Sequence, residues 1–318
     1  MSSRPFAFSR FSVRRFAVGA LLFVGAVCSP SSALFAETPA CPLGDAFEFA
    51  PELSDEFDGA ALDAEKWFDF NPAWRGRKPA LFSRQNVAVA DGTLRLTASL
   101  MKPEEVDVEN KVRGYDKYWK AIVKSREKIA YGYFEARCQA MRANVCNAFW
   151  LYDPHSDRPD VKYVEGEFSE EIDVLEVFGK PSAPSAQNVV WGTLHRYATP
   201  YLESIVNKKK DKLANKGFKF KAPFDPAADF HRYAVAWTPT EIRWFVDGEE
   251  VFVRENDFFH RPLHVVLDCE IMFDWMGEPD PADLPATFNV DYVRVWRLKD
   301  VKNANDAATS DANATAER

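Results

Sequence analysis

Three acidic side chains lie close together in the stretch EIDVLE, at Glu171, Asp173 and Glu176. Residues two apart on a β-strand point to the same face, so Glu171 and Asp173 share a face. Glu176 is three residues beyond Asp173, so a regular strand directs it to the opposite face. One extra residue, a β-bulge, would return Glu176 to the face of the other two, and bulges are frequent beside active sites. The stretch is therefore either an outer strand face with scattered acids or a set of three carboxylates gathered for chemistry.

Two glutamates with an aspartate between them suit the hydrolysis of a glycosidic bond. With the bulge, the α-carbons of Glu171 and Glu176 would be roughly 11–13 Å apart, at about 3.3 Å per residue. Their side chains could then lean inward over the shorter Asp173. Retaining glycosidases need two carboxyl groups about 5–5.5 Å apart, one as nucleophile and one as general acid and base. Asp173 would separate the two pKa values, because the reaction needs one ionised and one protonated group.

Beyond about residue 47, the chain is composed of short strand-like segments separated by turns. The predicted strands are 92–98, 131–140, 145–152, 171–178, 188–195, 231–237, 241–246 and 289–296. Asp247-Gly248 between two apolar runs predicts a hairpin. Residues 112–127 are an exception and predict a helical turn or a charged loop. Many short strands with hardly any helix between them predict an all-β sandwich or jelly roll of antiparallel sheets.

The first 36 residues have the layout of a secretory signal peptide. Four arginines precede an apolar run from Phe16 to Val27, and small residues follow. Arg14-Arg15 and Cys28 leave a twin-arginine signal and a lipid-anchored cysteine as alternatives. We therefore expect a secreted or periplasmic protein with no membrane association after cleavage.

The remaining chain divides into a large domain and a tail. We predict a catalytic domain at 37–298 and a disordered tail at 299–318, because the tail has almost no large apolar residue. Within the domain, the lysine-rich segment 207–221 is predicted to be a solvated loop. We expect the protein to be a monomer.

Charge and cysteine content narrow the class of partner. Without the four leader arginines, 36 basic residues face 48 acidic ones, a net charge of about −12, which disfavours nucleic acid as a partner. No CxxC pair is present, so zinc-ribbon and thioredoxin chemistry have no support. Cys138 and Cys146 flank a predicted hairpin turn at 142–144, and the sequence leaves open a disulfide or two buried thiols.

The stretch 171–176 resembles the active-site signature of glycoside hydrolase family 16, in the bulged form of its laminarinases, agarases, porphyranases and carrageenases. The resemblance extends over about residues 47–298. Further segments that resemble strands of this family are 132–137, 147–151, 230–237, 244–248 and 291–296.

The resemblance implies a role for each acid: Glu171 is the nucleophile, Glu176 the general acid and base, and Asp173 the residue that tunes them. It also implies a β-jelly roll of two curved sheets with the substrate in a concave cleft. The expected reaction is endo-hydrolysis of a β-glycosidic bond with retention of configuration, on a polysaccharide substrate and without a catalytic cofactor.

The segment 74–82, WRGRKPALF, resembles the agarase and porphyranase branch of the family, so a red-algal galactan is the first choice of substrate. Trp74 is a candidate platform for stacking on a sugar ring, and either Arg75 or Arg77 could bind hydroxyls or a sulfate group. The alternative is that Trp74 closes the end of the sandwich and the arginines are solvated.

Other candidate substrate-binding residues lie on later segments. The resemblance places Trp150 beneath the cleaved sugar. Trp191 and His195 are four apart on one predicted strand, so they share a face, and His195 is expected near the leaving group. Trp275 belongs to an aromatic segment expected to border the cleft.

Two points remain open from the sequence. The resemblance implies a structural calcium on the convex side, with the Gly92 carbonyl and the Asp291 carboxylate as candidate ligands. Two rival functions also stay open, an endo-β-1,3-glucanase of the same fold and a non-catalytic carbohydrate-binding lectin.

Overall fold

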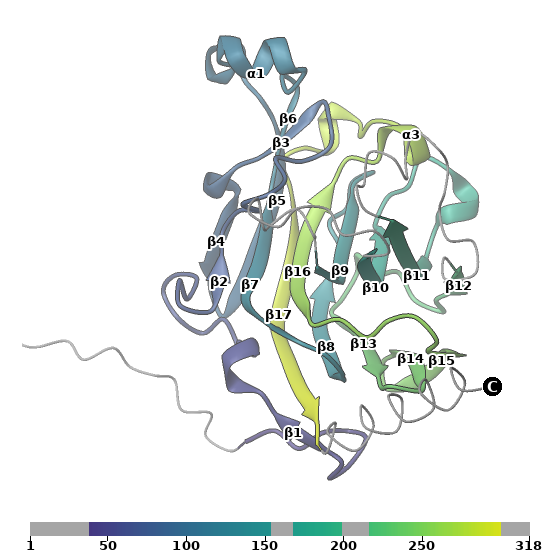
Figure 1. Ribbon diagram of the computed structural model, residues 1–318. Helices are drawn as coiled ribbons and strands as arrows, with labels where there is room; N and C mark the ends of the chain where they lie inside the picture. The colour runs from purple at the N-terminus through teal and green to yellow at the C-terminus, as the bar shows by residue number, and fades with distance from the viewer. Residues whose placement is uncertain (1–37, 154–167, 199–215, 300–318) are drawn as a thin grey trace, which may run out of the picture. The chain divides into compact units, whose positions relative to one another are not determined.

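The computed structural model of the chain describes residues 38–153, 168–198 and 216–299 (Figure 1). The predicted signal peptide, residues 207–215 and the predicted tail beyond Lys299 lie outside the described residues. Two short α-helices are described, α1 (Val108–Arg113) and α3 (Phe273–Met276). The described helices are all too short to cross a membrane.

Ten of the strands form one sheet, which we call the outer sheet. Its order is β15-β14-β13-β8-β17-β5-β6-β3, with β1 paired to β17 and β4 paired to β5. Its strands are β1 (Phe47–Phe49), β3 (Ala80–Phe82), β4 (Val87–Ala90), β5 (Thr93–Leu100), β6 (Tyr118–Lys120), β8 (Gly132–Gln139), β13 (His231–Trp237), β14 (Glu241–Val246), β15 (Glu249–Glu255) and β17 (Ala286–Leu298).

Seven strands form the second sheet, which we call the acid sheet because it carries the EIDVLE stretch. Its order is β12-β11-β10-β9-β16-β7-β2, so β10 is paired on both edges. Its strands are β2 (Trp67–Phe68), β7 (Ile122–Ile129), β9 (Cys146–Asp153), β10 (Phe168–Phe178), β11 (Val189–Ala198), β12 (Lys216–Lys221) and β16 (Leu263–Glu270).

The apolar core lies between the two sheets. On β5 of the outer sheet, Leu94 and Leu96 are fully buried in the core, whereas Arg95 between them is partly exposed. On β9 of the acid sheet, Phe149 and Leu151 belong to the same core. Each sheet therefore turns one face inward, and the acid sheet is left with a second face, which we call the acid face.

The predicted strands are present with small shifts of their ends, and residues 247–248 form the turn of the β14–β15 hairpin. The prediction for residues 112–127 was wrong. The short helix α1 ends at Arg113, and β6 and β7 occupy most of the remainder. The alternation of β7 was obscured because Lys124 and Ser125 are buried polar residues.

The lysine-rich segment is also ordered in part. Lys216–Lys221 forms β12, an edge strand that pairs only with β11 within the described residues. Phe218 and Phe220 are half-buried and alternate with exposed lysines. The prediction of a solvated loop was therefore wrong for this part of the segment, because two aromatic side chains at a spacing of two pack on the core.

The hairpin predicted between Cys138 and Cys146 is absent. Cys138 lies on β8 of the outer sheet, opposite His231 and Val290, whereas Cys146 lies on β9 of the acid sheet, opposite Phe178 and Glu270. The turn at 142–144 carries the chain from one sheet to the other. Both cysteines are buried and free, so the thiol alternative holds.

The end of β10 depends on a close backbone approach at Gly179. A β-carbon at this position would lie 2.2 Å from the Met141 carbonyl oxygen and 2.8 Å from the Ala227 β-carbon. We expect Gly179→Ala to lower the free energy of unfolding by about 2 kcal/mol, because the backbone must shift to admit the methyl group. Urea denaturation measures the loss. Gly59→Ala is the control, since a β-carbon at this exposed position approaches nothing closer than 3.4 Å. Equal stability of the two variants would contradict the expectation.

Candidate active site

A β-bulge in β10 brings the three acids to one face. Relative to β9, the register shifts between Asp173 and Leu175, and relative to β11 it shifts between Asp173 and Glu176. Val174 and its neighbour Leu175 both belong to the core, although consecutive residues of a regular strand point to opposite faces. The extra residue therefore returns Glu176 to the acid face, and the predicted bulge is confirmed.

The strands beside β10 show which side chains share the acid face, because directly opposed residues of antiparallel strands point the same way. In the order Glu171, Asp173 and Glu176, the partners on β9 are Tyr152, Trp150 and Ala148, and those on β11 are His195, Thr193 and Trp191. Trp150, Trp191 and His195, all predicted from the sequence, thus lie around the acids. Tyr152 and Thr193 were missed, although their spacing of two from Trp150 and Trp191 was a usable signal.

His195 is close to two of the three acids. Its Nε2 lies 3.3 Å from the Asp173 Oδ2 and 3.9 Å from the Glu171 Oε1. Only 18% of the Glu171 side chain and 7% of the Asp173 side chain are exposed. The imidazole therefore provides a partner for carboxyl groups that have lost most of their water.

Burial and mutual repulsion favour protons on the acids. Burial raises the pKa of Glu171 to about 8, with a further contribution from Asp173 and an opposing one from His195. Burial also raises the pKa values of Asp173 and Glu176. Because the groups are neighbours, they titrate together, and the site retains at least one proton at neutral pH.

A cationic group stands on one side of the acids. Arg77 Nε donates to the Glu270 Oε2 at 3.2 Å, and the fully buried Lys120 Nζ donates to the other oxygen of this carboxylate. Arg77 opposes the upward pKa shifts of Glu171 and Glu176, so its charge acts on both. About half of the Arg77 side chain is exposed, at 49%, so it can meet a ligand.

Trp74 and Arg75, also predicted from the segment 74–82, have different surroundings. Trp74 is half-buried and packs edge-to-face on Phe82 at 5.2 Å, beside the cluster that contains Trp150. Arg75 instead donates to the Asn110 Oδ1 of α1 at 2.6 Å. Of the two arginines that the sequence left as alternatives, Arg77 is therefore the one whose charge reaches the acids.

An aromatic group lies at the Glu176 end of the acid face. Trp275 of α3 packs edge-to-face on Trp191 at 5.0 Å and on Phe178 at 5.2 Å. Trp275 is 43% exposed and Trp191 only 7%. The predicted aromatic segment thus presents the Trp275 indole to solvent. Its contact with the buried Trp191 of β11 holds it in place.

A further carboxyl group on this face, Asp268, was missed. Asp268 of β16 is 1% exposed and opposite Ala148, whose other neighbour is Glu176. Burial raises the pKa of Asp268 well above its usual range, with Glu270 adding repulsion and the Trp150 indole opposing it. The sequence itself indicates that Glu270 faces the cleft, and Asp268 is two residues before it in LDCE, a spacing that could have revealed Asp268 as well.

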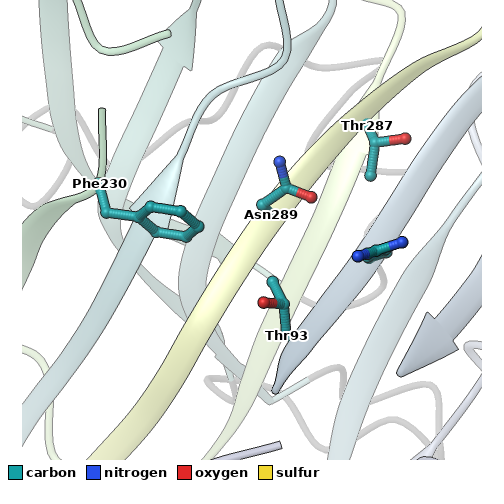
Figure 2. A pocket seen from close by; sticks show the side chains of 5 residues that line it. Thr93, Phe230, Thr287 and Asn289 are labelled. Atoms are coloured by element: carbon teal, nitrogen blue, oxygen red, sulfur yellow. The ribbon is translucent and has the colours of Figure 1, made fainter. Parts of the chain in front are cut away.

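The prediction of a structural calcium at Gly92 and Asp291 finds no support in the structure. The Asp291 carboxylate is 2.8 Å from the Arg137 guanidinium, so a cationic side chain is already paired with it. A hollow of about 370 Å³ on the solvent face of the outer sheet has no carboxylate in its lining (Figure 2). Its lining residues are Thr93, Arg95, Phe230, Thr287 and Asn289. Within the described residues, the side chains with metal-ligand spacing are Glu171, Asp173 and His195, and neither predicted calcium ligand is among them.

Comparisons with known proteins show which protein family this chain resembles. A family model described as the glycoside hydrolase family 16 domain of β-porphyranases A–D matches residues 47–298. β-Porphyranase B from Phocaeicola plebeius is 28% identical over 290 residues, covering 82% of this chain and 87% of the relative. A β-glucanase from Rhodothermus marinus is 29% identical over 266 residues, covering 77% and 84%.

The solved structure of porphyranase B from Zobellia galactanivorans shares the fold. It matches with a TM-score of 0.64 at 23% identity, covering 79% of this chain and 92% of that one. The two-sheet arrangement described above is accordingly a β-jelly roll, and the predicted fold class is confirmed.

The raised pKa of Glu171 makes a prediction about stability. The folded state holds this proton more tightly than the unfolded chain does, so stability is lost as pH rises from the usual value of 4.5 towards about 8. We expect Glu171→Gln to be more stable than the wild type at pH 8 by about 1–2 kcal/mol, or roughly 3–6 °C in Tm. The gain should vanish near pH 4.

Thermal unfolding at several pH values checks this expectation. Glu249→Gln, at an exposed position on β15, is the control and should follow the wild-type curve. A gain at pH 4 that is equal to the gain at pH 8 would show that repulsion and burial of charge are not its source.

Proposed function

The chain belongs to glycoside hydrolase family 16, and from this premise we propose that it is a secreted, retaining endo-β-glycosidase that hydrolyses a red-algal galactan of the agarose or porphyran type. The observation that carries the proposal is the bulge at Val174. It sets Glu171 and Glu176 on one face with Asp173 between them. His195 of β11, the cross-strand partner of Glu171, lies on the same face.

In the proposed reaction, Glu171 attacks the anomeric carbon while Glu176 donates its proton to the glycosidic oxygen. The bond to the leaving sugar breaks, and a covalent glycosyl–Glu171 intermediate forms. Glu176, now ionised, takes a proton from water, and the hydroxide displaces Glu171. Two inversions restore the original configuration, and Glu176 is protonated again by the water, because its first proton left with the departing sugar. The reaction needs no cofactor.

Asp173 and His195 adjust the charges in this cycle. Glu171 must be ionised before attack, and the imidazole 3.9 Å away favours that form. Glu176 must keep its proton, and the neighbouring Asp173 raises its pKa. When Glu171 becomes esterified, one negative charge leaves the group, so Glu176 can release its proton more easily.

The choice of a galactan rests on two observations. The matching family model describes β-porphyranases, and the segment 74–82 places Arg77 beside the acids with half of its side chain exposed. A guanidinium can hold a sulfate group or sugar hydroxyls through paired hydrogen bonds.

An endo-β-1,3-glucanase is the second candidate. A relative named as a β-glucanase is as similar in sequence as a relative named as a β-porphyranase, at 29% and 28% identity. Overall identity therefore does not separate the two substrates.

A panel of agarose, porphyran, carrageenan and laminarin tests the proposal. We expect reducing ends to be released from agarose or porphyran and the first product seen by NMR to be the β-anomer. Glu171→Gln should lose turnover by at least about 10⁴-fold and still bind the polysaccharide, because only the nucleophile is removed. Cleavage of laminarin alone would favour the second candidate. Binding without turnover by the wild type would favour a lectin, and an α-anomeric first product would exclude retention.

The two arginines of the segment 74–82 provide a matched pair. We expect Arg77→Ala to raise KM for a sulfated galactan about tenfold and KM for its desulfated form about twofold, since a charged hydrogen bond is worth more than a neutral one. Arg75→Ala should change either KM by less than about twofold, because its guanidinium pairs with Asn110 and Glu109 of α1, whereas the charge of Arg77 acts on the acids. Steady-state kinetics on both forms measure the difference. A larger effect from Arg75→Ala would reverse the assignment.

A further inference from the structure

The bulge in β10 leaves backbone groups without their regular hydrogen-bond partners. Where one strand has an extra residue, the ladder of hydrogen bonds is interrupted, and a buried carbonyl needs another donor. The Asp173 carbonyl oxygen accepts a hydrogen bond from the Trp244 indole Nε1 at 2.9 Å, in a buried environment. Trp244 belongs to β14 of the outer sheet, so this hydrogen bond crosses the core from one sheet to the other.

Gly192 makes room for that indole. It lies on β11 between Trp191 and Thr193, the partners of Glu176 and Asp173, and so stands beside the bulge. A β-carbon at Gly192 would lie 2.9 Å from the Trp244 Nε1 and 2.3 Å from the nearest Phe218 ring atom. Any larger residue there would push against the donor itself.

Aromatic packing fixes the position of the indole from its other side. The Phe218 ring of β12 lies 5.5 Å from the Trp244 ring and 4.8 Å from the Phe252 ring of β15. Trp244 is 2% exposed. The donor is therefore held between strands of both sheets, where it has little freedom to move away from the bulge.

We propose that Trp244 is a positioning residue for catalysis, acting through the Asp173 carbonyl to fix the bulge and thereby the directions of the Asp173 and Glu176 side chains. Trp244 faces the core and does not touch substrate. The proposal rests on the catalytic roles proposed for Glu171 and Glu176. If the carbonyl loses its donor, the bulge relaxes, and a shift of about 1 Å at a catalytic group can reduce turnover by up to about 100-fold.

A second tryptophan provides the matched control. Trp237 on β13 is fully buried in the same core, and its Nε1 donates to the Phe259 carbonyl oxygen at 2.9 Å. That carbonyl lies in the connection between β15 and β16, not in the bulge. Trp244→Phe and Trp237→Phe therefore make the same chemical change, the loss of one buried indole donor to a backbone carbonyl.

The experiment compares the two variants on the polysaccharide that the wild type cleaves. We expect Trp244→Phe to lower kcat by at least about tenfold and to leave KM within about threefold of the wild type. We also expect it to shift the alkaline limb of the profile of kcat against pH, which reports the pKa of the general acid Glu176. Trp237→Phe should keep kcat within about twofold and leave the pH profile unchanged. Similar kcat values for the two folded variants would overturn the proposal.

Two further measurements cover the other outcomes. If Trp244→Phe does not fold, Gly192→Ala takes its place, and a kcat equal to that of the wild type would overturn the proposal. If the wild type cleaves no substrate of the panel, the proposed function fails, but crystal structures of the two variants still test the positioning. They should show the Glu176 carboxyl displaced in Trp244→Phe and unmoved in Trp237→Phe, and an unmoved carboxyl in both would overturn the proposal.

Discussion

An ionised carboxylate cannot lie in the apolar core between two sheets without a large cost in free energy, and this constraint determines the geometry of β10. A regular strand would turn Glu176 into the core. The bulge instead gives the core two consecutive apolar residues, Val174 and Leu175, and returns Glu176 to the acid face. The hydrophobic effect and the desolvation of charge thus favour the same irregularity, and the gathering of the three acids on one face follows from it.

The same constraint explains why the acid face is rich in compensating groups. Glu270, only 4% exposed, is paired with both Arg77 and Lys120, whereas Asp268 is held in surroundings that favour its protonated form. The acids of β10 are less buried and lie beside His195. Positive charge is therefore bound mainly at Glu270, and the acids of β10 keep the raised pKa values that acid catalysis needs.

The fold could be predicted from the sequence where alternation was clear, as in 92–98 and 231–237. The prediction failed in β7, where Lys124 and Ser125 are buried. The strand that pairs with β7 at this point, β16, is far away in the sequence, so nothing nearby indicated that these polar residues are buried. The bulge was predictable because Glu171, Asp173 and Glu176 can share one face of a strand only if the strand has an extra residue. The hydrogen bond from the Trp244 indole to the Asp173 carbonyl could not be predicted, because it joins two sheets and two residues that are 71 positions apart in the chain. The failed Cys138–Cys146 hairpin has the same origin: a turn in the sequence does not reveal whether the chain returns to its own sheet or crosses to the other one.

In the proposed function, catalysis and substrate choice depend on different parts of this molecule. The acids belong to β10, whose bulge depends on its central position in the sheet, with β9 and β11 on either side and β14 across the core. Arg77 and Trp74 come from the connection between β2 and β3, which contributes little to the core. Substitution in that connection can therefore change the ligand without disturbing the core, although loss of Arg77 would also remove a charge that lowers the pKa values of Glu171 and Glu176. Overall identity is accordingly a poor guide to the ligand of a chain built in this way, since a change of a few residues in one connection alters it very little.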